Sequence, residues 1–168
     1  PCGDIYGEVE DYTLNIQASA PPCNNLISDS FENGFANWND GGNDVKRIDT
    51  LANTGNYSIR LRDNSGVASS MFSDPLDLSA YNEATIDFSF YPNSMENGED
   101  FFLELSLDGG VNYSIIQTWA RGTHFNNNSR YNESVTIPGS FSSNTVFRFR
   151  CDASGNKDYI YIDTKEAK

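Results

Sequence analysis

The stretch Ala84–Gly110, ATIDFSFYPNSMENGEDFFLELSLDGG, decides the fold. Apolar side chains alternate with more polar ones in its first half, at Ile86, Phe88 and Phe90, and again after a polar break, at Phe101, Leu103, Leu105 and Leu107. This period of two is typical of strands with one buried face, whereas a helix would place apolar residues three and four positions apart. Asp108-Gly109-Gly110 tolerates positive φ and predicts a chain reversal. The stretch therefore predicts sheet strands with one buried and one presented face.

Similar runs recur along the chain from residue 25 onward. They occupy residues 25–32, 45–49, 56–62, 67–73, 84–91, 100–107, 112–120, 131–137, 145–151 and 159–164. Turn residues separate these runs, and no segment shows a convincing helical period. Many short strands at this spacing are typical of two sheets packed face to face. We therefore predict an all-β fold, a β-sandwich (jelly roll) of two antiparallel sheets.

The composition limits the classes of partner. The chain has 168 residues and a formal net charge of −13, so it offers no general basic field for nucleic acid. No apolar run approaches the length of a membrane span. We expect no nucleic-acid partner, no membrane partner and a monomeric module.

The cysteines and the known catalytic motifs give little sign of redox, metal or catalytic chemistry. Cys2 and Cys23 would pair in an oxidising compartment or remain free, and both options stay open. Cys151 lies in phase with Phe147 and Phe149, which predicts a buried free thiol. Because no nucleophile elbow, P-loop, HExxH or CxxC motif is present, we predict a module that is not an enzyme.

The first segment of the chain carries a specific motif. Residues 7–12, GEVEDY, closely resemble the motif that names the GEVED domain of secreted multidomain proteins from Bacteroidota. The resemblance implies that residues 1–18 are the C-terminal strand remnant of such a domain, and the proline-containing residues 19–24 read as a linker. Residues 25–168 would then form the β-sandwich, excised from a larger protein.

A second resemblance covers the sandwich itself. Four motifs occur in a familiar order: Phe31-Glu32-Asn33-Gly34 followed by Trp38, then TGNYSIRL at 54–61, LSLDGG at 105–110 and YIYID at 159–163. This order resembles the jelly-roll domains, related to MAM-type and carbohydrate-binding modules, that are attached to secreted bacterial enzymes. The resemblance implies an accessory module of a polysaccharide-degrading enzyme, secreted or at the cell surface of a bacterium.

Arginines on the predicted strands are the first candidate contacts for a ligand. Four of the seven fall on the non-core phase: Arg60, Arg62, Arg148 and Arg150. One interpretation is a sheet face that grips sulfate or carboxylate groups, because a guanidinium presents a planar fork to such anions. The alternative is a cross-strand ladder of these arginines with Asp87 and Glu104, which the frequency of exposed ion pairs favours. Of the four, Arg148 and Arg150 are the candidate ligand contacts.

The loop at 121–130 and its flanks are the second candidate. This segment combines aromatic, amide and cationic side chains, and its candidate ligand residues are Trp119, Arg121, His124, Phe125, Arg130 and Tyr131. Aromatic rings bind the apolar faces of sugars, amides bond to hydroxyls, and arginine or histidine meets an anionic substituent. Lys46 and Arg47 form a further basic pair near Trp38, which we predict to be a core residue. Trp119 is equally compatible with a place in the core.

The jelly-roll resemblance also implies a structural calcium ion. Its ligands would come from the first strand, the NTGN turn and the last strand, namely Asp29, Glu32, Asn53, Asn56 and Asp163. Calcium takes six to eight oxygen ligands and tolerates irregular geometry, so this oxygen-rich set suits it. The alternative is that these are ordinary solubilising side chains at strand ends.

Together these features favour a non-catalytic carbohydrate-binding module that holds a secreted enzyme on a polysaccharide. The arginines favour an anionic glycan, either uronic or sulfated, such as a marine fucan or carrageenan. The competing interpretation is a MAM-like spacer or protein-interaction domain that binds no sugar. A stand-alone glycosidase is the third, because two carboxylates brought together only by the fold would escape sequence inspection.

Overall fold

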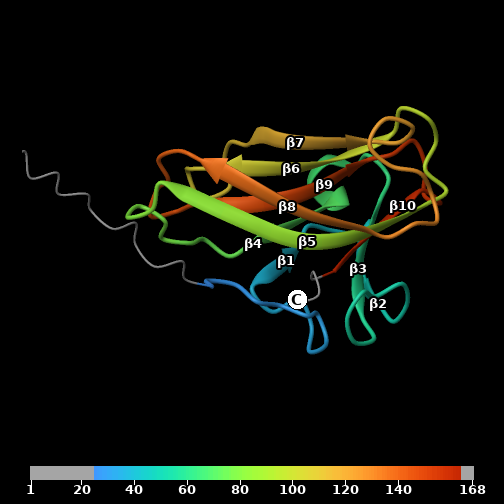
Figure 1. The fold of residues 1–168 in the computed structure, drawn as a ribbon, viewed down its shortest axis with the longest axis horizontal. Coiled ribbons are helices and arrows are strands. Elements are labelled where there is room, and N and C mark those ends of the chain that lie inside the picture. The colour runs from blue at the N-terminus through green and yellow to red at the C-terminus, as the bar shows by residue number, and fades with distance from the viewer. Residues whose placement is uncertain (1–24, 164–168) are drawn as a thin grey trace, which may run out of the picture.

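The chain folds into two five-stranded antiparallel sheets that pack face to face, as seen in a computed structural model that describes residues 25–163 (Figure 1). The predicted all-β jelly-roll sandwich is therefore confirmed. The predicted GEVED remnant at 1–18 and the linker at 19–24, with Cys2 and Cys23, lie outside the described residues.

Each sheet is assembled from strands that are distant in sequence. Sheet A has the order β1 (Trp38–Asp40), β4 (Ser70–Ser73), β9 (Val146–Asp152), β6 (Asp100–Ser106) and β7 (Ser114–Ala120). Sheet B has the order β2 (Val45–Ile48), β3 (Ser58–Arg62), β10 (Tyr159–Asp163), β5 (Glu83–Asn93) and β8 (Tyr131–Pro138). A single 3-10 turn, η1 (Gly66–Ser69), precedes β4 in the described range. No helix within residues 25–163 has the length and apolar character needed to cross a membrane.

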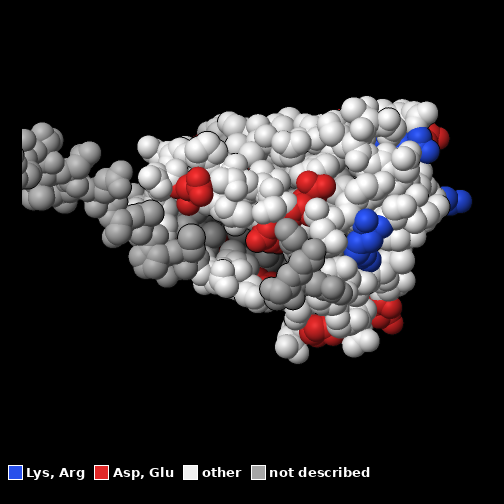
Figure 2. Space-filling view, viewed as in Figure 1, with Lys and Arg blue, Asp and Glu red and all other residues white. Residues whose placement is uncertain are grey.

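Charge is spread unevenly over the surface. Figure 2 shows acidic side chains across the visible side of the molecule, whereas the basic ones lie toward the right-hand end of the view. In Figure 1 this is the end at which β6 begins and β7 ends. Although the net charge is −13, basic side chains are therefore concentrated at one end of the visible surface.

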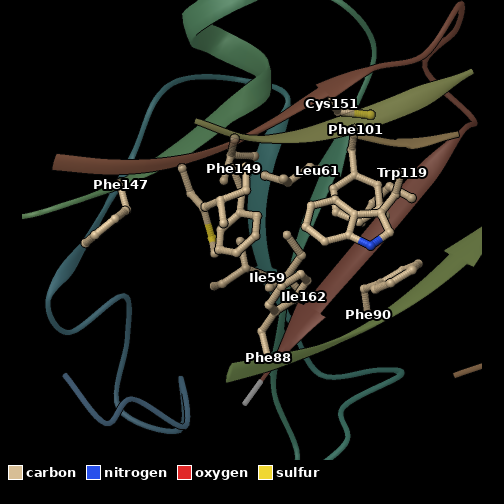
Figure 3. Close-up of a cluster of buried hydrophobic side chains, with 14 of the residues drawn as sticks. Ile59, Leu61, Phe88, Phe90, Phe101, Trp119, Phe147, Phe149, Cys151 and Ile162 are labelled. Carbon is tan, nitrogen blue, oxygen red and sulfur yellow. The ribbon is translucent and has the colours of Figure 1, made fainter. Parts of the chain in front are cut away.

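Aromatic rings from both sheets fill the core (Figure 3). The ring centroids of Phe88 (β5) and Phe149 (β9) lie 4.7 Å apart, and those of Phe90 (β5) and Phe101 (β6) lie 4.8 Å apart. Such tilted and edge-on contacts suit the ring quadrupoles and add to the apolar area that is buried. Cys151 lies in this core as a free thiol, as predicted, and burial raises its pKa to about 12.

The structure differs from the predicted strands at the beginning of the sandwich. No strand forms over residues 25–32, because Phe31 adopts a positive φ of 58° and its carbonyl accepts a hydrogen bond from Gly34 N in a turn. The first strand is instead β1, in which Trp38 lies opposite Ser73 of β4. Three residues are too few to show a period of two, so the sequence did not predict this strand. Trp38 is half-buried and packs against Phe149, which agrees with the predicted core position.

We predict that Phe90→Ala lowers the free energy of unfolding by about 3–5 kcal/mol, because it leaves a cavity at a position that is 0% exposed. Urea denaturation measures this value. As a control, Ile115→Ala on the surface is expected to change it by at most about 0.5 kcal/mol. A Phe90→Ala variant as stable as the native protein would contradict the assigned core.

Candidate functional site

The strand arginines divide between the two sheets, so the single arginine-bearing face predicted from the sequence is wrong. Arg60 and Arg62 lie on β3 in sheet B, and Arg148 and Arg150 lie on β9 in sheet A. In both strands they alternate with buried residues, so each pair faces outward from its own layer. The two outer faces of a sandwich point in opposite directions, and one ligand segment cannot lie flat on both.

On the outer face of sheet A, the arginines are paired with one carboxylate. Arg148 Nε donates to Glu104 Oε2 at 2.6 Å, and Arg150 Nε donates to Glu104 Oε1 at 3.2 Å. The register sets this triad, because Glu104 on β6 lies directly opposite Arg148 on β9. The cross-strand ladder is thus the observed arrangement for Glu104. Asp87 does not join it, because β5 belongs to sheet B.

Aromatic rings complete the triad. The Arg148 guanidinium lies 3.5 Å from the ring centroid of Tyr113, and that of Arg150 lies 4.5 Å from the ring centroid of Phe102. Stacking on one side and ion pairing on the other hold both guanidiniums in place. Because Glu104 is almost fully buried, removing its carboxylate would leave two guanidiniums without their partner.

Beside this triad, the outer face of sheet A is hollowed. A hollow of about 190 Å³ lies between the β6–β7 hairpin, β4 and η1. Apolar, aromatic and polar groups share its lining, which comprises Asn39, Val67, Phe72, Ser73, Pro75, Gly109, Gly110, Tyr113, Val146 and Arg148. We call this concavity the sheet A hollow. It brings aromatic rings and a guanidinium to one place that solvent reaches.

The β6–β7 hairpin that carries Tyr113 is held by a carboxylate. Asp108 Oδ1 accepts from the backbone N–H of Asn112 at 2.9 Å, and Asp108 Oδ2 accepts from the Asn112 side chain at 2.7 Å. The Ser106 hydroxyl donates to Asp108 at 2.7 Å. These hydrogen bonds to the charged form lower the pKa of Asp108 from 3.8 to about 2. The hairpin is therefore ordered by its own side chains.

The aromatic platform predicted in the loop 121–130 is wrong. Trp119 and Phe125 are 3% and 2% exposed, and Trp119 stacks on the core ring of Phe101 at 4.9 Å. The Tyr131 ring stacks on Phe90 at 5.0 Å, and its hydroxyl accepts from Asn126 N at 2.8 Å. Burial of these rings stabilises the fold and holds the loop against the core.

The polar side chains of this loop bond to neighbouring backbone and side-chain groups and so fix the loop in place. Arg121 Nη1 donates to the Asn97 side chain, and Arg130 donates to Leu51 O. His124 is exposed, and its Nδ1 accepts the backbone N–H of Ala120 at 3.0 Å. Because these side chains already bond to other parts of the protein, they are less available to a ligand than the sequence predicted.

The basic pair at 46–47 is split by the strand period. Lys46 is exposed on the outer face of sheet B, opposite Arg60. Arg47 turns the other way, donates to the carbonyls of Phe31 and Glu32, and stacks 3.3 Å from the ring centroid of Tyr57. Only Lys46 therefore presents its charge as predicted.

Four of the five predicted calcium ligands lie at one turn, and only Asp29 lies elsewhere. Glu32 Oε1 accepts from the backbone N–H groups of Asn56 (2.9 Å) and Tyr57 (2.8 Å), and Asp163 Oδ2 accepts from those of Asn53 (2.5 Å) and Thr54 (2.9 Å). Both carboxylates thus hold the same turn.

Gly55 at the centre of this turn has a φ of +63°, and a Cβ there would lie 2.5 Å from the Glu32 carboxylate. Asp29 bonds elsewhere, to the Asn37 side chain at 3.1 Å. Within residues 25–163 no cluster of three or more His, Cys, Asp or Glu side chains suits a metal ion. A cation at this turn would therefore depend on Glu32, Asp163 and backbone or amide oxygens.

Several residues of the sheet A hollow were not predicted from the sequence. Tyr113 follows the DGG reversal, and its place near the beginning of a strand was a usable signal. Phe72 and Asn39 reach the hollow because β1, β4 and β9 are neighbours in sheet A, although they are remote in sequence. No local pattern in the chain indicates that neighbourhood.

Solved structures share this fold. The xylan-binding domain of carbohydrate-binding module family 22 matches with a TM-score of 0.59 at 17% identity, covering 86% of this chain and 94% of that one. The K3 cleaved adhesin domain of Lys-gingipain from Porphyromonas gingivalis matches with a TM-score of 0.57 at 15% identity, covering 83% and 95%. The chain therefore has the β-sandwich fold found in carbohydrate-binding modules and in a cleaved adhesin domain.

A further match belongs to a longer enzyme. The family 22 and glycoside hydrolase family 10 modules of Clostridium thermocellum endo-1,4-beta-D-xylanase 10B, complexed with xylohexaose, match with a TM-score of 0.58 at 19% identity. This chain is covered to 83% but spans only 27% of that protein. No protein-family profile and no curated protein sequence matches the chain. At these identities the likeness concerns the fold alone.

We predict that Asp108 stabilises the hairpin above about pH 4 and loses this effect as the pH falls toward 2. A carboxyl whose pKa is lowered on folding, here from 3.8 to about 2, stabilises the folded state above its unfolded pKa and not below its folded one. Melting temperatures of the native protein and of Asp108→Asn should therefore differ near neutral pH and converge near pH 2. A difference that stays constant over this range would contradict the assignment. Asp49→Asn, which removes an exposed carboxylate elsewhere, is the control.

Proposed function

We propose that the chain is a non-catalytic carbohydrate-binding module whose glycan site is the sheet A hollow. One observation carries the proposal: a hollow on an outer sheet face gathers aromatic rings, a guanidinium and small glycine residues in one place. The likeness of the fold to xylan-binding domains supports the same class of function. In this role the module would hold a secreted parent enzyme on its substrate.

The hollow offers the contacts that a sugar needs. The rings of Tyr113 and Phe72 provide apolar surface for the C–H faces of a pyranose. Arg148 uses its Nε for Glu104, and its terminal N–H groups are donors for hydroxyl or carboxylate oxygens. Because the triad and the Asp108 hydrogen bonds already fix these groups, little ordering would be needed on binding. Modest affinity at one site would be amplified along a polymer with many equivalent sites.

We also propose that the polymer is anionic, with sulfate or uronate groups. Support comes from the triad, in which two guanidiniums share one carboxylate and leave one positive charge in excess. The pairing makes Arg148 and Arg150 less available than isolated arginines, with side chains 14% and 19% exposed. An anionic preference is therefore expected to appear as salt sensitivity of a modest affinity.

A second candidate function has a specific observation in its favour. Pairing of Arg148 and Arg150 with Glu104 is what a MAM-like spacer or protein-interaction domain would show on a closed, solvated sheet face. The likeness to a cleaved adhesin domain is compatible with that class. It differs from the main proposal in predicting no retention on any polysaccharide.

We predict that Tyr113→Ala weakens glycan binding about tenfold, because losing one aromatic contact of about 1.4 kcal/mol changes an equilibrium constant by that factor. Affinity electrophoresis through gels that contain xylan, polygalacturonate or a sulfated polysaccharide measures the change. Retention on the anionic gels should fall when the salt rises from about 50 mM to about 500 mM, and retention on xylan should not.

Ile115→Ala is the matched control, because Ile115 is 53% exposed on the same outer face and does not line the hollow. Equal retention of Tyr113→Ala and the native module would remove the hollow as the binding site. Absence of retention on every gel would favour the spacer function instead.

We propose, in addition, that calcium stabilises the turn at 53–57 through the carboxylates of Glu32 and Asp163. Adding a chelator to the purified module is then expected to lower the melting temperature, and restoring calcium to raise it. A ligand present at about 100 times its Kd contributes about 2.7 kcal/mol. The response should be lost in Asp163→Asn and kept in Asp29→Asn, because Asp29 bonds to Asn37 instead. A melting temperature that ignores chelator and calcium would exclude the ion.

A further inference from the structure

The outer face of sheet B carries a row of cationic and aromatic side chains that the sheet A hollow does not use. Lys46 on β2 lies opposite Arg60 on β3, Arg60 lies opposite Tyr161 on β10, and Tyr161 lies opposite Tyr91 on β5. Neighbouring strands are about 4.8 Å apart, so the row extends about 14 Å across the sheet. We call Lys46, Arg60, Tyr161 and Tyr91 the basic–aromatic row.

Two further side chains extend the row. The guanidinium of Arg60 lies 4.8 Å from the ring centroid of Tyr159, and that of Arg130 lies 5.5 Å from the ring centroid of Tyr91. The ring centroid of Tyr161 is 6.0 Å from that of Tyr159 and 6.5 Å from that of Tyr91. Tyr161 is buried, with 7% of its surface exposed, whereas Lys46 is exposed and Arg60, Tyr91 and Tyr159 are half-buried. The rings meet edge to face, at 72° between Tyr91 and Tyr161 and 64° between Tyr159 and Tyr161, and cations lie at both ends of the row.

Charge on this face is incompletely balanced. Like charges directly opposite each other in a sheet are destabilising, and Lys46 and Arg60 occupy such positions. Within residues 25–163 neither of them forms an ion pair, whereas Arg62, the next outward-facing residue of β3, pairs with Asp44 at 2.9 Å. The Nε of Arg60 is also shielded from solvent without a hydrogen-bond partner among the described residues. An anion bound from outside beside Lys46 and Arg60 would relieve the repulsion between these two cations.

We propose that the basic–aromatic row is a second ligand site, which binds a saccharide bearing carboxylate or sulfate groups. The guanidinium of Arg60 and the ammonium of Lys46 would meet the anionic substituents, and the half-buried Tyr91 and Tyr159 would contact the saccharide, with the buried Tyr161 supporting them from below. A saccharide suits this site better than an acidic peptide does, because the row runs across the open face of a sheet, whereas peptides are usually held in grooves or along strand edges. The inference rests on the proposed glycan function and adds to the sheet A triad a second contact for the anion, on the face opposite the hollow.

Single substitutions test this site. Lys46→Gln and Arg60→Gln should each reduce retention in heparin or polygalacturonate gels at least fivefold, while leaving retention on neutral xylan unchanged. Heparin separates a preference for sulfate from the preference for carboxylate that polygalacturonate reports. The matched control is Lys157→Gln, which removes another exposed positive charge, from a loop, and should retain native mobility shifts. Because Lys46 is exposed, Lys46→Gln is expected to leave the packing of the core unchanged, so a loss of retention would reflect binding.

The outcomes separate this inference from the proposed function. If Lys46→Gln and Arg60→Gln are retained like the native module on both anionic gels, the second site is overturned. The same holds if the native module is retained by neither anionic gel, or if it binds polyglutamate but no anionic glycan. Xylan retention that depends on Tyr113 would still support the hollow in each case. Conversely, anionic retention that survives Tyr113→Ala and is lost in Lys46→Gln supports the second site alone.

Discussion

The packing of aromatic rings between the two sheets is the constraint on which the rest of the structure depends. Phe88 and Phe90 from β5 contact Phe149 and Phe101 across the sandwich with centroid distances of 4.7 and 4.8 Å. Since side chains alternate along a strand, burying these rings fixes the direction of every neighbouring residue. A slip of one residue in β6 would bring Glu104 into the core and Phe101 to the surface. The outer faces are therefore set by what the interior requires.

The same alternation produces two outer faces that differ in how many of their cationic side chains are paired with a carboxylate. On sheet A, a nearly buried carboxylate joins two guanidiniums and leaves a hollow beside them. On sheet B, Arg62 has its carboxylate, but Lys46 and Arg60 face each other without one in the described residues. Removing one member of a buried ion pair is strongly destabilising, so we expect the triad on sheet A to support the scaffold, and our proposal gives Lys46 and Arg60 on sheet B the contact with a ligand. This contrast, more than the total number of arginines, distinguishes the roles of the two faces.

The sequence was sufficient to predict the sandwich and the phase of most strands, because a period of two is a local signal. It could not predict which sheet a strand joins, and Arg60 and Arg148 therefore appeared to share a face. It also misplaced Phe125 and left Trp119 open between core and surface, since an aromatic residue beside a polar loop has the same local pattern whether it is buried or exposed. The hollow was not predicted either, because Phe72 and Tyr113 meet through the order of strands in sheet A. These contacts are fixed by topology, and a single sequence carries no local record of them.

The opposed directions of the two outer faces have a consequence for how such a module would act on a solid substrate. Surfaces on opposite sides of a two-layer sandwich cannot lie along the same straight polymer segment, so engaging both requires two separate strands. If both proposed sites bind glycan, a small domain built in this way would bridge neighbouring fibres. Under that proposal it would alter the texture of a polysaccharide gel by cross-linking it.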